Sequence, residues 1–219
     1  MASIEQTVPA REALLRAARE ELVEKGHAAV SLRAVARRAG VSHAAPAHFF
    51  GDRAGMLTAV ATDGFGMLER ALEDAARKAS GGGETTLAAL GLAYVDFGLA
   101  HPALVDLMFR RSELVPDDPS LVAAQRAALG RLRGAVGDVV GERAEEWSLV
   151  SWAVVHGLVN IVREGLLARI AGYEPDREAD HARELVALYA TAFGRQLGAG
   201  GGEGLRGQAT ASFPELGRS

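Results

Sequence analysis

Apolar residues recur at helical spacing along nearly the whole chain, and this pattern constrains the fold more than any other feature. From Leu32 to Ala39, for example, apolar side chains stand at positions i, i+3, i+4 and i+7, which places them on one face of a helix. Runs of β-branched residues are scarce, so a large sheet is not expected. The sequence therefore predicts an all-α protein.

Glycine, proline and capping residues divide this pattern into about nine helices. Gly26 and Gly40 stand where helices should end, and Asp52 and the pair Asp118-Pro119 stand where helices should begin. The expected helices cover, approximately, residues 11–25, 32–39, 43–50, 53–79, 86–100, a segment from Pro102, and residues 119–140, 142–170 and 175–197.

A length of 219 residues allows one large domain or two small ones. We expect a three-helix domain over residues 1–52 and a larger helical domain over residues 53–197. Residues 198–219 are rich in glycine and polar side chains, which predicts a flexible tail.

Motifs for catalysis and cofactor binding are missing. The chain has no cysteine, so disulfides, thiolate metal sites and cysteine nucleophiles are excluded. Its six histidines are scattered and form no zinc motif. The glycine pattern at residues 202–207 follows a helix rather than a strand, so it does not indicate a dinucleotide site. We expect no enzyme activity, no metal and no cofactor.

No export signal or membrane span is expected. The first ten residues lack an apolar core of signal length. The most apolar stretch, residues 147–162, is shorter than the ~20 residues that a span needs and contains His156 and Asn160. These features predict a soluble cytoplasmic protein that does not enter a membrane.

Positive charge is concentrated in residues 31–53. Although the whole chain has a formal charge of −4, this segment holds four arginines (Arg33, Arg37, Arg38 and Arg53) against one acid, Asp52. Such a patch on an acidic protein is either a nucleic-acid contact or a solvated face, and charge alone does not decide between the two.

The turn Gly40-Val41-Ser42 separates two short helices. Glycine can adopt positive φ and reverse the chain, valine fills the angle between the helices, and serine can cap the second helix, which we expect to begin at His43. This arrangement is typical of a helix-turn-helix, whose second helix enters the major groove of DNA. The alternative is an ordinary three-helix core segment.

Three motifs in the N-terminal part resemble the tetracycline-repressor (TetR) family: residues 31–42, His48-Phe49-Phe50 and residues 52–57. A second resemblance lies downstream, where Trp152, His156 and Gly157 have the spacing of one TetR-type C-terminal domain, the Trp-His-Gly type. The resemblance implies a homodimer that binds a palindromic operator on double-stranded DNA. It also implies a small-molecule effector in the C-terminal domain that releases the DNA.

The resemblance also implies which residues contact DNA. Hydroxyl and basic side chains at the starts of the helices match phosphate contacts, and residues of the recognition helix match base contacts. The residues carried over are Ser31, Arg33, Ser42, His43, Ala44, Ala47, His48 and Arg53.

Two positions depart from the family pattern. Ala47 stands where the family usually has a tyrosine that holds phosphate, and Pro46 lies inside the recognition helix. The alanines of this helix, Ala44, Ala45 and Ala47, can contact thymine methyl groups but make no bidentate hydrogen bonds. We therefore expect modest sequence specificity, read partly from DNA shape.

Apolar residues of the larger helical domain suggest a ligand pocket and a dimer interface. The apolar lining predicts a hydrophobic effector. The alternative is that these residues belong to a plain core and that His156 is structural. The pocket candidates are Phe65, Leu68, Leu72, Tyr94, Phe97, Met108, Phe109, Trp152 and His156. The interface candidates, for which a monomeric core is the alternative, are Val154, Leu158, Ile161, Leu185, Tyr189 and Phe193.

These observations favour a ligand-responsive transcriptional regulator that acts as a repressor. The alternative is a dimeric helical small-molecule binding protein whose DNA-binding arm is weak or vestigial, as the small side chain of Ala47 would allow.

Overall fold

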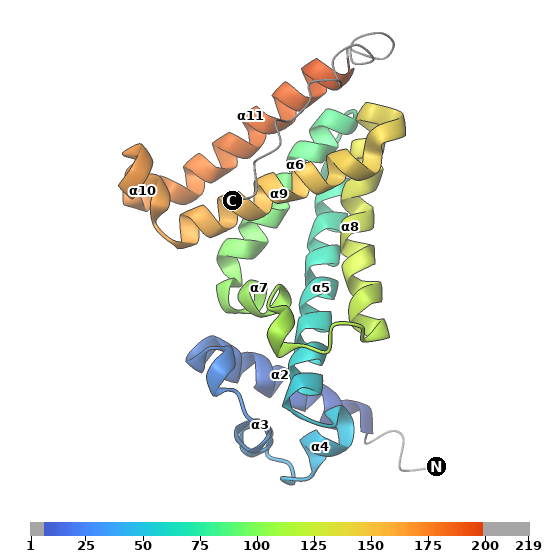
Figure 1. Ribbon diagram of the computed structural model, residues 1–219, viewed down its shortest axis with the longest axis vertical. Coiled ribbons are helices and arrows are strands. Elements are labelled where there is room, and N and C mark those ends of the chain that lie inside the picture. Colours follow the sequence, from blue (N-terminus) through green and yellow to red (C-terminus); the bar gives the residue numbers. More distant parts are fainter. Residues whose placement is uncertain (1–6, 199–219) are drawn as a thin grey trace, which may run out of the picture.

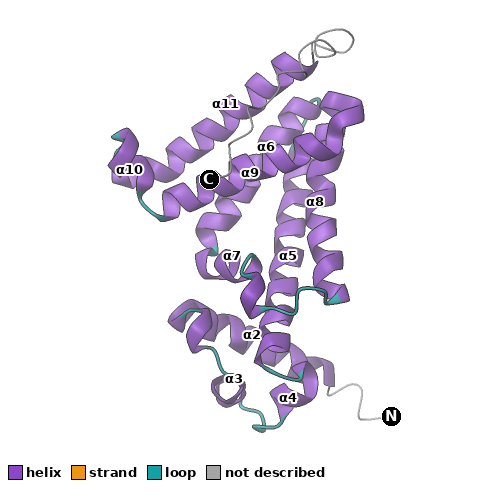
Figure 2. Cartoon of the chain, viewed as in Figure 1, coloured by secondary structure: helices purple, strands orange, loops and turns teal. Residues whose placement is uncertain are grey.

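The computed structural model describes residues 7–198, and every regular element in that range is helical (Figure 2), which confirms the all-α prediction. The tail expected from Gly198 onward lies almost entirely outside the described residues. The ten α-helices within residues 7–198 are α2 (Thr7–Lys25), α3 (Leu32–Ala39), α4 (Ala45–Phe50), α5 (Arg53–Lys78), α6 (Gly83–Ala100), α7 (Pro102–Met108), α8 (Pro119–Val140), α9 (Ala144–Arg163), α10 (Leu166–Ala171) and α11 (Glu178–Gly198).

The helices form a small N-terminal group and a larger C-terminal group (Figure 1). Helices α2, α3 and α4 pack together at one end of the molecule, and α5 runs from this group into the larger one. There α5 packs against α6 and α8, while α9 and α11 cover the other side of α6. Helix α5 begins at Arg53.

Most helix boundaries follow the capping signals in the sequence. Gly26 has φ of 73° after α2, and Gly40 has φ of 66° in the left-handed region after α3. The side chain of Asp52 accepts a hydrogen bond from the Gly55 amide, and Asp118 accepts from the Ser120 and Leu121 amides. These caps satisfy amide groups that a helix start leaves unpaired.

The recognition helix begins later than the sequence suggests. Ser42 and His43 belong to the turn, and α4 starts at Ala45 without a side-chain cap from Ser42. Pro46 is therefore the second residue of the helix, where a missing amide proton costs nothing. The prediction of a helix from His43 capped by Ser42 is wrong, because it did not use proline's preference for the first turn.

The single helix expected over residues 142–170 is two helices. Gly165 has φ of 64° and separates α9 from α10. The expected start of the helix is instead a short 3₁₀ turn at Gly141–Arg143. A left-handed residue cannot continue an α-helix, so the apolar pattern continues across a break in the backbone.

Close packing around α6 depends on glycine. An added Cβ at Gly98 would lie 2.6 Å from a methyl of Val159 on α9, and one at Gly91 would lie 2.6 Å from a methyl of Val186 on α11. Helix α6 therefore lies deep in the C-terminal group and brings its side chains toward α8, α9 and α11.

Within residues 7–198, no single helix is long and apolar enough to cross a membrane. Helices α6 and α7 are long and apolar enough only when they are taken together, and the chain bends by 105° between them.

Candidate DNA-binding surface and ligand cavity

The turn and recognition helix present a mostly polar face to solvent. His43, Ala44, Ala47 and His48 are all exposed, and Ser42 is exposed beside them. Pro46 is buried and holds α4 against the rest of the N-terminal group. Arg33 on α3 and Ser31, which precedes this helix, are both exposed, and Ser31 caps α3 by accepting a hydrogen bond from the Ala34 amide at 3.3 Å.

Arg38 is tied to three glutamates of α2. Its guanidinium donates to Glu21 at 2.8 Å and to Glu24 at 2.7 Å, and it lies 3.4 Å from Glu20. Hydrogen bonds from Lys25 and Arg38 lower the pKa of the buried Glu21 carboxyl. Arg38 therefore joins α2 to α3, and most of its charge is compensated within the chain.

Arg53 is also engaged within the chain. Its guanidinium donates to the Val30 carbonyl at 3.0 Å, to the His27 carbonyl at 2.6 Å and to Glu113 at 2.6 Å. The resemblance implied a phosphate contact for this residue. In the structure its side chain lies between the N-terminal group and the segment after α7. Two of the four arginines in residues 31–53 are thus paired with acids of the same protein.

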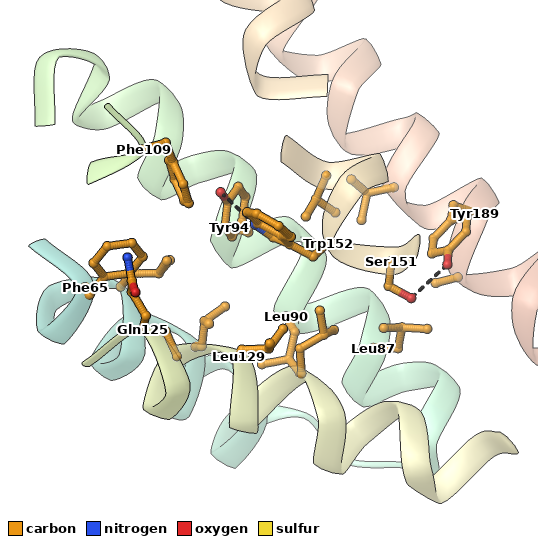
Figure 3. Close-up of a pocket in the computed structure, with 18 residues that line it drawn as sticks. Phe65, Leu87, Leu90, Tyr94, Phe109, Gln125, Leu129, Ser151, Trp152 and Tyr189 are labelled. Atoms are coloured by element: carbon orange, nitrogen blue, oxygen red, sulfur yellow. Dashed lines mark hydrogen bonds between the residues drawn. The ribbon is translucent and has the colours of Figure 1, made fainter. Parts of the chain in front are cut away.

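A cavity of about 320 Å³ lies in the C-terminal group between α5, α6, α8, α9 and α11 (Figure 3). Its wall is almost entirely apolar, and Leu129, which lines it, is 37% exposed, so the cavity reaches the surface beside α8. The lining residues are Phe65, Leu68, Leu72, Leu87, Leu90, Gly91, Tyr94, Phe109, Gln125, Ala128, Leu129, Leu132, Ser151, Trp152, Val155, Val186, Tyr189 and Ala190.

The structure brings six of the nine pocket candidates to this cavity. They are Phe65, Leu68, Leu72, Tyr94, Phe109 and Trp152. The other three lie outside its wall. Phe97 stacks on His101, Met108 is buried against Gly64, and His156 lies behind Tyr94.

The contributions of α8 and α11 were missed by sequence reasoning. Gln125 and Leu129 come from α8, and Val186 and Tyr189 come from α11. Their spacing resembles that of any buried helix face, so only the packing of these helices around α6 shows that they line a cavity.

One polar cluster in the wall centres on Tyr94. The indole Nε1 of Trp152 donates to the Tyr94 hydroxyl at 3.3 Å, and this hydroxyl lies 2.9 Å from Nδ1 of His156. Burial raises the pKa of Tyr94 to about 12. Burial, together with the charge of Arg163, lowers the pKa of His156 below 6.5. Both side chains therefore stay neutral near pH 7.

A second polar pair lies toward the α11 side. The Ser151 hydroxyl is 2.8 Å from the Trp147 carbonyl and 2.8 Å from the Tyr189 hydroxyl, as Figure 3 shows for the latter pair. Burial raises the pKa of Tyr189. None of the residues in the cavity wall carries a charge at neutral pH.

Helices α9 and α11 expose apolar side chains on their outer face. Leu149 and Val150 on α9 are 48% and 44% exposed, and Leu188 on α11 is 65% exposed. Val154, Leu158, Ile161 and Leu185, which were predicted for an interface, are half-buried.

The last two interface candidates point inward. Phe193 is buried against Trp147, and Tyr189 turns toward Ser151 and the cavity. The expectation that both residues face a partner does not match the structure, because α11 presents a different stripe outward.

Two family models match the chain. One, described as bacterial regulatory proteins of the tetR family, matches residues 14–60, and the other, a tetracyclin repressor-like C-terminal domain, matches residues 87–188. A solved protein with unknown function from Rhodococcus sp. RHA1 is 33% identical, with a TM-score of 0.73, over 86% of this chain and 95% of that one. The chain belongs to the TetR family. The second model spans the Trp152, His156 and Gly157 motif.

Further TetR-family structures share the fold at lower identity. A bacterial regulatory protein in the tetR family from Rhodococcus RHA1 is 18% identical, with a TM-score of 0.60, over 86% of this chain and 97% of that one. The TetR-like transcriptional regulator LfrR from Mycobacterium smegmatis, in complex with proflavine, is 21% identical, with a TM-score of 0.53, over 81% of this chain and 94% of that one. Comparison with curated protein sequences finds no match.

Proposed function

We propose that this TetR-family protein is a transcriptional repressor that releases its operator when a small apolar molecule enters the cavity. One observation carries the proposal. Helix α5 begins directly after the recognition helix, and the same helix lines the cavity with Phe65, Leu68 and Leu72. A ligand that displaces these side chains would tilt the helix that carries the DNA-binding group.

The ligand must distinguish two states of the protein. An effector shifts the equilibrium only if it binds the state that cannot hold DNA more tightly than the state that can. In the arrangement proposed here, a tilt of α5 changes the position of the recognition helix. In a dimer, the distance between the two recognition helices would then no longer fit two adjacent half-sites.

We further propose that two protomers associate through α9 and α11. The exposed side chains of Leu149, Val150 and Leu188 make an apolar face on these helices, and paired helices from two protomers can form a four-helix interface. Gly157 lies on α9 with no atom within 4 Å of an added Cβ inside the protomer, which leaves room for a partner helix.

The proposed DNA contacts are the exposed residues of the turn and recognition helix together with α3. His43 and Ala44 would face base edges, and Arg33, Ser42 and His48 would lie near phosphate. A regulator of this kind acts on chromosomal DNA, so we place the protein in the cytoplasm.

A second function is favoured by the small basic charge of this surface. Arg38 and Arg53 are paired with glutamates, and Ala47 offers no hydroxyl. A dimeric binding protein with a weak DNA-binding arm would have these features as well.

Selection of bound duplexes from a random DNA library, at near-physiological salt, separates the two functions. A repressor should enrich a palindrome, and its half-site spacing should report the distance between recognition helices. A dimer with about eight phosphate contacts should also show a log–log salt slope of roughly −7. A folded protein that enriches no sequence and has a slope near zero would instead be the binding protein.

A further inference from the structure

Three residues that line the cavity carry hydroxyl groups: Tyr94, Ser151 and Tyr189. A hydroxyl has one proton to donate and two lone pairs to accept with. The protein partners of each hydroxyl therefore determine what it can still offer to a bound molecule.

The Ser151 and Tyr189 pair has no proton left to donate. The Ser151 oxygen lies 2.8 Å from the Trp147 carbonyl oxygen, and a carbonyl has no proton, so the serine proton must lie between these two atoms. The proton between Ser151 and Tyr189, also 2.8 Å apart, must then come from Tyr189. The Tyr189 oxygen keeps both lone pairs and can only accept.

The Tyr94 hydroxyl is in a similar state. Its oxygen already accepts from the indole of Trp152, which can only donate. With a neutral His156 protonated on Nε2, Nδ1 is an acceptor, and the proton of Tyr94 is directed to it at 2.9 Å. The reverse arrangement would direct the tyrosine proton toward an apolar wall. Tyr94 therefore offers one lone pair to the cavity.

Size and charge restrict the ligand further. A cavity of about 150 Å³ holds benzene, and this cavity, at about 320 Å³, has room for roughly two rings. Its wall has no charged side chain, so an ion would enter without a counter-charge, at high desolvation cost.

We propose that the ligand is an uncharged, two-ring-sized apolar molecule with a hydroxyl or N–H group, and that this group donates a hydrogen bond to the Tyr189 oxygen. Tyr189 is chosen over Tyr94 because it has two free lone pairs instead of one. Gln125, at the Phe65 side of the cavity in Figure 3, can both donate and accept, so it does not select between the two kinds of ligand. That this ligand is the effector rests on the proposed function, whereas its binding does not.

Isothermal titration calorimetry on the full chain tests the proposal with three probes on one skeleton. 2-Naphthol is neutral and can donate, 2-methoxynaphthalene is neutral and can only accept, and 2-naphthoate is an anion. We expect 2-naphthol to bind about 5- to 10-fold more tightly than the methyl ether, because one hydrogen bond is gained. We expect 2-naphthoate to bind most weakly.

Matched variants locate the selectivity. Tyr189→Phe removes the acceptor and should reduce the preference for 2-naphthol to about 2-fold or less, with binding of the methyl ether unchanged. Tyr173→Phe removes a hydroxyl outside the cavity wall and should leave the preference intact. Gln125→Met should also leave it intact.

Three results would overturn the proposal. They are equal affinity for 2-naphthol and its methyl ether, tightest binding of 2-naphthoate, and no binding of any probe by the folded protein. DNA selection is measured separately without the probes. A failure there, with donor-selective binding retained, would reject the repressor and keep the ligand class.

Discussion

The guanidinium of Arg53 lies 2.6 Å from the carboxylate of Glu113, and this ion pair joins the N-terminal helices to the segment after α7. Arg53 also holds the carbonyls of His27 and Val30, which follow α2. Glu113 stands four residues after Phe109, which lines the cavity. Hydrogen bonding to Arg53 lowers the pKa of Glu113. The pair therefore lies on a short path between the cavity and the DNA-binding group.

We expect Arg53→Ala and Glu113→Gln to weaken operator binding together, each by about 5-fold, because both release the same contact between the two groups. Neither variant should change the salt dependence of binding. Fluorescence anisotropy of a labelled operator at several salt concentrations measures both quantities. Arg33→Ala is the control, and it should make the log–log salt slope less negative. If Arg53→Ala, but not Glu113→Gln, reduced the magnitude of the salt slope by about one per lost contact, Arg53 would be a phosphate contact.

Glu21 gives the N-terminal group an acid-sensitive stability. Lys25 and Arg38 donate hydrogen bonds to its buried carboxylate and lower its pKa. The carboxylate therefore stabilises the folded state above pH 4.5, which is the ordinary pKa of a glutamate. This contribution is lost as the pH falls through the lowered pKa of the folded state. Glu21→Gln should therefore reduce the free energy of unfolding at neutral pH by about 1–2 kcal/mol and make it less sensitive to acid.

The matched control for Glu21 is its neighbour Glu20. The side chain of Glu20 is half exposed and lies 3.4 Å from the same arginine, so Glu20→Gln should change stability little. Urea unfolding followed by circular dichroism at neutral and acidic pH measures both variants. Equal losses for the two would mean that burial of Glu21 adds nothing to the ion pair.

Sequence patterns predicted most of the elements that depend on local chemistry, except the start of α4 and the break at Gly165, and they failed where distant helices decide. Caps at Asp52 and Asp118 and stops at Gly26 and Gly40 act within a few residues, so they could be read directly. Arg53 could not, because its partner Glu113 stands 60 residues away.

The cavity shows the same limit. The aromatic residues of α5, α6 and α9 could be predicted to line the cavity because large apolar side chains on one helix face indicate a buried face. The α8 wall at Gln125 and the inward turn of Tyr189 depend on how α8 and α11 pack around α6, and periodicity within one helix carries no information about that packing.

His156 should make the folded protein less stable in mild acid. Because its pKa in the folded state lies below 6.5, the unfolded chain takes up a proton first as the pH falls. The free energy of unfolding should therefore decrease as the pH falls below 6.5. His156 should cause no further decrease once the pH is below its lowered pKa in the folded state. His156→Asn, whose side-chain oxygen can replace Nδ1 as an acceptor, should flatten this part of the profile. Thermal unfolding at successive pH values measures it, and the exposed His43, changed to Asn, is the control.

The outer face of α9 and α11 predicts how association can be broken without unfolding the protomer. Leu188 is 65% exposed, so Leu188→Glu should leave the protomer's helix content unchanged and weaken dimerisation by at least about 10-fold. Sedimentation velocity over a concentration series measures the dissociation constant. Val23→Glu, at an exposed apolar residue of α2, is the control that should have no effect. A monomeric protein before substitution would contradict the proposed interface.

Ala47 is exposed on the recognition helix, between the buried Pro46 and the exposed His48. Because the side chain points to solvent, a tyrosine can be placed there without disturbing the packing of α4. Its hydroxyl would then reach phosphate, so Ala47→Tyr should strengthen binding to all DNA sequences alike, by about 5-fold. The control is Ala44→Tyr, which puts the same bulk at the position proposed to face base edges and should weaken binding. Competition between operator and unrelated duplexes measures both effects. Unchanged affinity for Ala47→Tyr would show that the missing hydroxyl does not limit DNA binding in this protein.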